Sequence, residues 1–110
     1  IIVSTPQEVA LLDVKRGIKM FDKLGVKILG LVDNMSFFIG DDGKKYKIFG
    51  EGGVKKTAKE FQKEFLGEIP IYPEVGKTGD EGKPIVETNP DHEISKIYLN
   101  FAEKIKLTYL

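Results

Sequence analysis

IIVSTPQE, residues 1–8, is the stretch of the 110-residue sequence that decides the fold. Its first three residues form an apolar run typical of a strand buried on both faces of a sheet. Thr5, Pro6 and Glu8 then match a helix start, with a Thr cap, Pro at the first helical position and Glu three residues after the cap. Because chains seldom begin inside a core, we expect further sequence before Ile1 in the native protein.

The segments that follow predict an α/β fold. Apolar residues at steps of three and four predict a helix over residues 7–23, which Gly25 ends because glycine tolerates a positive φ. Residues 26–32 read as a second buried strand, and a strand, a helix and a strand form a right-handed parallel crossover. The helix positions are Leu11, Val14, Ile18 and Phe21.

The remaining segments continue this pattern with one interruption. Two short apolar runs around Gly40-Asp41-Asp42-Gly43 predict a β-hairpin insert over about residues 36–49. A helix with apolar positions from Val54 to Phe65 follows, and then a third strand over residues 65–71, which prolines end. Residues 74–83 read as loop or marginal helix, before a closing amphipathic helix from Ile94 to Ile105.

Composition excludes several classes of function. Seventeen basic residues balance seventeen acidic ones, so the chain has no net positive charge that would attract nucleic acid. No segment approaches the roughly 20 apolar residues of a membrane span. The chain has no cysteine and no secretory leader pattern, so we expect a soluble, cytoplasmic protein without disulfides or thiolate metal sites.

Unusual residues gather where the predicted strands end. Residues 5–7, 33–36 and 70–73 each follow a strand, and the carboxyl ends of parallel strands share the edge at which open α/β sheets bind ligands. Taken singly, each has a plainer explanation, since Thr caps helices and Pro ends strands. Together they predict a ligand site at this edge.

Five runs carry a family resemblance: IVSTPQ at 2–7, VDNMS at 32–36, IFGEGG at 48–53, LGEIP at 66–70 and GKPIV at 82–86. In this order they resemble successive signatures of the Mrp/Nbp/ApbC group, within the MinD/ParA-like family. The resemblance implies a dimeric, doubly wound P-loop ATPase that uses ATP and Mg²⁺ while it carries iron-sulfur clusters to client proteins. Residues 1–110 would be its C-terminal part.

The resemblance also implies roles for individual residues. Asn34 would read the adenine edge, and Pro70 and Ile71 would pack on the ring. Asp13 would lie near the contact between subunits of a homodimer, with Phe37 and Phe38 of the hairpin as further candidates. The plainer alternatives are that Asn34 caps the turn into the hairpin and that Asp13 is an exposed helix carboxylate.

The phosphate-binding half of the family pattern is absent from these 110 residues. No glycine-rich loop ends in Lys-Ser or Lys-Thr, and no Mg²⁺-binding acidic segment accompanies one. Gly50–Gly53 lacks that ending and reads as a helix N-terminus. We therefore expect the catalytic residues upstream of Ile1, and no ATP hydrolysis by residues 1–110 alone.

The family's Cys-x-x-Cys is also missing, because the corresponding stretch is residues 39–43, IGDDG. Carboxylates suit Mg²⁺ or Ca²⁺ and do not replace thiolates on iron, so Asp41 and Asp42 form either a weak cation site or a solvated hairpin tip. His92 stands without a second His or Cys, which favours helix-terminus electrostatics over metal ligation.

A second function fits the same residues. The chain could be an α/β interaction module without catalysis that presents an aromatic hairpin surface made of Phe37, Phe38, Tyr46 and Phe49. A Gly-Lys-Ser/Thr loop upstream of Ile1 in the native reading frame would distinguish the ATPase fragment from this module.

The missing thiolates give a first prediction. After incubation with ferrous iron and sulfide followed by desalting, the 110-residue chain should be colourless, because it offers iron no sulfur ligand. The visible absorption spectrum is the measurement. A charge-transfer band that survives desalting would show that another set of ligands exists.

Overall fold

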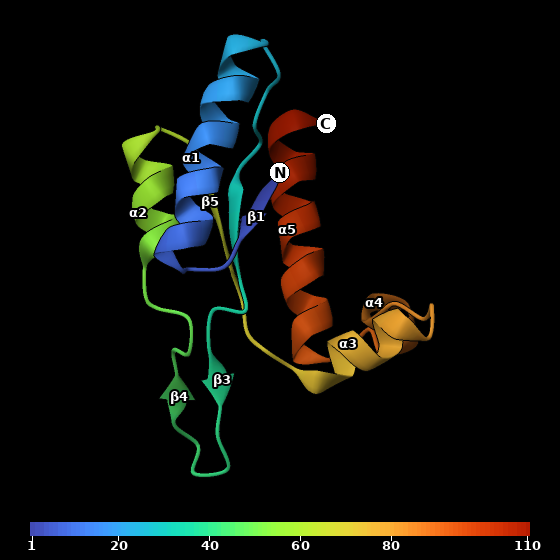
Figure 1. Cartoon of the computed structure of the whole chain (residues 1–110). Coiled ribbons are helices and arrows are strands. Elements are labelled where there is room, and N and C mark those ends of the chain that lie inside the picture. The colour runs from blue at the N-terminus through green and yellow to red at the C-terminus, as the bar shows by residue number, and fades with distance from the viewer. The chain divides into compact units, whose positions relative to one another are not determined.

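A three-stranded parallel sheet organises the first part of the chain (Figure 1). The computed structural model describes residues 1–110, which divide into two compact units, Ile1–Pro70 and Ile71–Leu110. In the first unit the strand order is β1 (Ile2–Ser4), β2 (Leu31–Asn34) and β5 (Phe65–Ile69), all parallel. The predicted α/β class and parallel crossover are therefore confirmed.

Two helices pack together in this unit and supply half of its core. α1 (Glu8–Lys23) and α2 (Gly53–Glu60) lie side by side against the sheet (Figure 1). Their apolar stripes meet the sheet because residues three and four apart share one helix face. The buried cluster comprises Leu11, Val14, Ile18, Leu31, Val54 and Ala58, with Ile2, Ile28, Phe61 and Phe65 packed against it.

The structure corrects the start of the first helix. Gln7, not Thr5, is the N-cap of α1, and no side chain caps the helix. The Thr5 hydroxyl instead donates to the side-chain oxygen of Gln7 at 3.1 Å. Pro6 is buried ahead of the helix.

Two strand predictions also need correction. Residues 26–30 are not in a strand, and β2 begins at Leu31, because the apolar run from Val26 serves partly as the exit from α1. Within residues 1–110 the run at the N-terminus is not buried on both faces: Val3 is 56% exposed, because it points away from the sheet face on which Ile2 packs against the buried cluster. β5 stops at Ile69, immediately before Pro70, as a strand must when the next residue lacks an N–H.

The predicted hairpin insert is present with short strands. β3 (Phe38–Ile39) and β4 (Lys45–Tyr46) pair antiparallel, and Gly43 takes the positive φ of +77° that the reversal needs. The hairpin leaves the carboxyl end of β2 and returns to the loop before α2 (Figure 1).

Three helices make up the second unit: α3 (Pro73–Asp80), α4 (Ile85–Thr88) and α5 (Glu93–Tyr109). Of the two alternatives for residues 74–83, loop or marginal helix, the structure has mostly helix: α3 begins with Pro73 at its first position. Sequence reasoning did not predict α4. None of the helices is both long and apolar enough to cross a membrane.

Close packing between the strands depends on Gly30. A Cβ at this position would lie 2.6 Å from Cγ of Leu66, which is the extra residue where the register between β2 and β5 shifts. Leu66 is itself buried, so it cannot move aside without opening the core.

We predict that Gly30→Ala lowers the free energy of unfolding by about 1 to 3 kcal/mol through overpacking. Gly17→Ala is the matched control, because nothing lies within 4 Å of that position in α1 and alanine favours the helix by roughly 0.5 to 1 kcal/mol. Urea unfolding measures the free energy of unfolding of both variants. Equal stability of Gly30→Ala and the unmodified chain would contradict this packing.

Candidate functional site

The carboxyl edge of the sheet brings together side chains from all three strands. Ser4 on β1 pairs in register with Asp33 on β2, which pairs with Glu68 on β5. Residues in register on parallel strands point to the same face, so these three form a polar row across the sheet. Asn34, one residue further along β2, pairs with Ile69 and points to the opposite face.

Asn34 is the last residue of β2, is half-buried, and makes no side-chain hydrogen bond. The turn after it is held by other groups: Met35 takes a φ of +52°, and the Ser36 N–H donates to the Ile69 carbonyl oxygen at 3.0 Å. Both hydrogen-bonding functions of the Asn34 amide are thus available to a ligand.

The other two residues expected beside adenine lie at the boundary between the units. Pro70 directly follows Ile69, the register partner of Asn34, and is buried. Ile71 is half-buried and begins the second unit.

Asp33 is a buried carboxylate that sequence reasoning did not single out. It is 2% exposed, its Oδ2 accepts a long 3.5 Å hydrogen bond from the Ser36 hydroxyl, and its Oδ1 has no partner. Burial and the nearby charge of Glu68 raise the pKa of Asp33 to about 6, although Ser36 and Lys47 act in the opposite direction. The sequence feature that could have predicted this buried carboxylate is an acidic residue within VDNMS that directly follows the apolar Leu31 and Val32.

Lys47 links this edge to the end of the hairpin. Its ammonium donates to Glu51, and Glu51, Glu68 and Asp33 all raise the pKa of Lys47. One basic group therefore faces three acidic ones where the hairpin rejoins the body of the unit. This excess of negative charge makes the Asp33 side of the edge a poor site for a phosphate.

The glycine run 50–53 lies beside a cleft of about 520 Å³ between α1 and α2. Gly52 is the N-cap of α2 with a φ of +72°, and a Cβ on Gly53 would lie 2.5 Å from Leu11 Cδ1 and 3.2 Å from the Pro6 oxygen. The positive φ explains Gly52 and close packing explains Gly53. Asn34 and Pro70 do not line the cleft.

The candidates for subunit contact lie on separate elements. Asp13 projects from α1 with an 81% exposed side chain and a long ion pair to Arg16 at 4.0 Å. Phe37 is half-buried with the Lys45 ammonium 4.4 Å from its ring centroid, and Phe38 is exposed on β3.

The candidate metal ligands do not assemble. No group of three or more His, Asp or Glu side chains is placed to hold a metal ion. Asp42 accepts hydrogen bonds from Tyr46 and from the Lys44 N–H. His92 is the N-cap of α5: its Nδ1 accepts from the Ile94 N–H at 3.1 Å, and its Nε2 lies 3.4 Å from Glu74.

Residues 1–106 match the family described as ParA, NUBPL iron-transfer P-loop NTPase. The iron-sulfur cluster carrier protein of Aquifex aeolicus is 44% identical over 94% of this chain and 29% of its own length. The iron-sulfur cluster transfer protein NUBPL of Dictyostelium discoideum is 48% identical over 96% of this chain and 33% of its own length. The chain thus spans about a third of these relatives.

Two solved structures resemble the fold. A nucleotide-binding protein from Archaeoglobus fulgidus in complex with ADP has a TM-score of 0.64 and 35% identity, covering 81% of this chain and 37% of its own. The cell division ATPase MinD of Pyrococcus furiosus has a TM-score of 0.70 and 23% identity, and the match covers 94% of this chain and 40% of the MinD chain.

The raised pKa of Asp33 predicts how stability depends on pH. Because the folded pKa of about 6 exceeds the ordinary 3.8, this group favours folding below pH 3.8, and that contribution is lost as the pH rises through 6. Asp33→Asn should therefore gain about 2 kcal/mol relative to the unmodified chain between pH 4 and pH 7.

Urea unfolding at several pH values measures this difference. Asp41→Asn at the exposed hairpin tip is the control for the change in net charge. A constant difference between Asp33→Asn and the unmodified chain from pH 4 to pH 7 would show that the Asp33 carboxylate is not destabilised by burial.

Proposed function

Because the chain belongs to the ParA family, in its NUBPL iron-transfer P-loop NTPase group, we propose that it forms the adenine side of an ATP site in a longer iron-sulfur cluster transfer protein. The observation that carries this proposal is the unpaired amide of Asn34 at the carboxyl edge of the parallel sheet. The ADP complex of the Archaeoglobus fulgidus relative supports a nucleotide as the ligand.

The chemistry of Asn34 suits adenine. The amide presents a donor and an acceptor in one plane, and adenine offers an amino donor beside a ring-nitrogen acceptor. Guanine carries a carbonyl oxygen in place of that amino group, so the same contact disfavours it. Pro70 and Ile71, which have no charged side chain, would pack on the ring.

The phosphate side of the site lies, in this proposal, on a segment outside residues 1–110. These residues contain no Lys-Ser or Lys-Thr loop, and the curated relatives are about three times as long. The chain is then the C-terminal part of the P-loop domain, and Mg²⁺ and the triphosphate are held by the other part.

The iron-sulfur cluster would be the cargo of the complete protein. Residues 1–110 provide no thiolate for it, so any sulfur ligand comes from elsewhere. A nucleotide-controlled homodimer would use exposed groups such as Asp13 and Phe38 for its subunit contact, and client proteins would receive the cluster.

Asn34→Ala in the complete protein tests the assignment. ATP binding should weaken by about 1 to 3 kcal/mol, the cost of leaving polar groups of adenine unpaired, and the preference for ATP over GTP should fall. Asn100→Ala, on the exposed face of α5, is the matched control. Isothermal titration with ATP and GTP measures both affinities.

Thermal unfolding of the same variants separates binding from folding. If Asn34→Ala binds ATP and GTP as the unmodified protein does while its melting temperature falls, Asn34 is a turn residue and the adenine assignment is wrong.

A further inference from the structure

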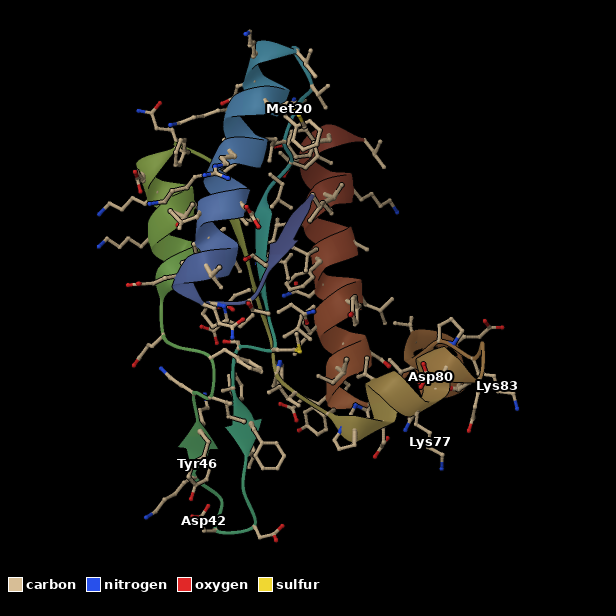
Figure 2. All side chains as sticks on the ribbon, viewed as in Figure 1. Met20, Asp42, Tyr46, Lys77, Asp80 and Lys83 are labelled. Carbon is tan, nitrogen blue, oxygen red and sulfur yellow. The ribbon has the colours of Figure 1, made fainter.

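The tip of the hairpin is closed by its own side chains. The Tyr46 hydroxyl on β4 donates to Oδ2 of Asp42, and the Lys44 N–H donates to Oδ1 of the same carboxylate at 2.9 Å. Figure 2 shows Asp42 and Tyr46 next to one another at the end of the hairpin. Asp42 thus joins the turn to the returning strand.

Gly40 completes this arrangement because the Tyr46 ring lies against it. A Cβ at position 40 would lie 2.6 Å from Tyr46 Cε2 and 2.9 Å from Asp42 Oδ1. The backbone of Gly40 is also engaged, since its N–H donates to the Lys44 oxygen at 3.0 Å and its oxygen accepts from the Gly43 N–H at 2.9 Å. A side chain at position 40 would therefore push the Tyr46 ring or the Asp42 carboxylate out of this arrangement.

The second glycine of the tip is required for a different reason. Gly43 has a φ of +77°, which other residues rarely adopt, and nothing lies within 4 Å of where its Cβ would be. One glycine therefore makes room for Tyr46, and the other makes the turn.

We propose that Tyr46, Asp42 and Gly40 form a self-closed tip that is ordered without metal and fills the space that a cluster ligand at position 40 would need. The proposal concerns residues 39–43, the stretch that corresponds to the family's Cys-x-x-Cys. It implies that cysteine at position 40 would displace Tyr46 from Asp42, so the tip and a thiolate at this position exclude one another.

The charges at the tip agree with closure near neutral pH. Hydrogen bonds from Tyr46 and the Lys44 N–H lower the pKa of Asp42 below 3.8, and Asp42 raises the pKa of Tyr46 above 10. The closed tip therefore loses stability only as the pH falls through the depressed pKa of Asp42 or rises through the elevated pKa of Tyr46. Lys44, Lys45 and Asp41 are the other charged groups on the tip.

A double-mutant cycle tests the role of the ring. In the intact, ¹⁵N-labelled protein with chelator present, Gly40→Ala and Tyr46→Leu should each speed exchange of the Lys44 amide roughly two- to tenfold, the effect of losing one exposed hydrogen bond. The combined effect in the double variant should be smaller than the product of the two single effects, because the alanine no longer meets a ring and keeps only its contact with Asp42 Oδ1.

Gly43→Ala is the matched control. It should speed exchange of the Lys44 amide in either background, because its strain does not involve Tyr46. Amides of β2 should be unchanged in all variants, which shows that the sheet is intact. These outcomes do not depend on ATP binding, so they stand apart from the proposed function.

Three results would overturn the proposal. They are a Gly40→Ala amide profile equal to that of the unmodified protein, additive effects of Gly40→Ala and Tyr46→Leu, and slower exchange at the tip when iron or zinc replaces the chelator.

Discussion

The position of β2 between β1 and β5 is the constraint on which the rest of the first unit depends. Leu31 and Val32 are buried at 0% and 3% exposure, and parallel pairing on both sides fixes their register. Parallel neighbours require helical crossovers, which bring α1 and α2 together over the core. The same pairing places the ends of all three strands at one edge, where polar side chains can meet a ligand.

At that edge, the alternation of side chains along β2 separates two kinds of chemistry. Asp33 points toward Ser4 and Glu68, where it lies buried with an unpaired oxygen, while Asn34 points to the other face with its amide free. A buried acidic group is costly to the fold and is more often found at functional sites than elsewhere. The strand thus carries a destabilising residue beside the one proposed to read the base.

Sequence reasoning predicted the elements whose signals are local and periodic. The spacing of Leu11, Val14 and Ile18 located α1, and the two glycines of the tip located the hairpin. It misplaced β2, because an apolar run from Val26 to Val32 does not reveal which of its residues find a pairing partner. The glycines of residues 74–83 left loop and marginal helix both open there, and the structure has the helix α3. The raised pKa of Asp33 and the packing of the Tyr46 ring on Gly40 depend on tertiary contacts, which no local sequence pattern predicts.

Photolabelling of the complete protein with 8-azido-ATP tests the central claim most directly, because the reactive group sits on the adenine ring. Peptide mapping should find the label on segments that contain Asn34 or Pro70–Ile71, and excess ATP, but not GTP, should prevent it. Label confined to segments outside residues 1–110, or to the 50–53 glycine run, would contradict the assignment of this sheet edge to adenine.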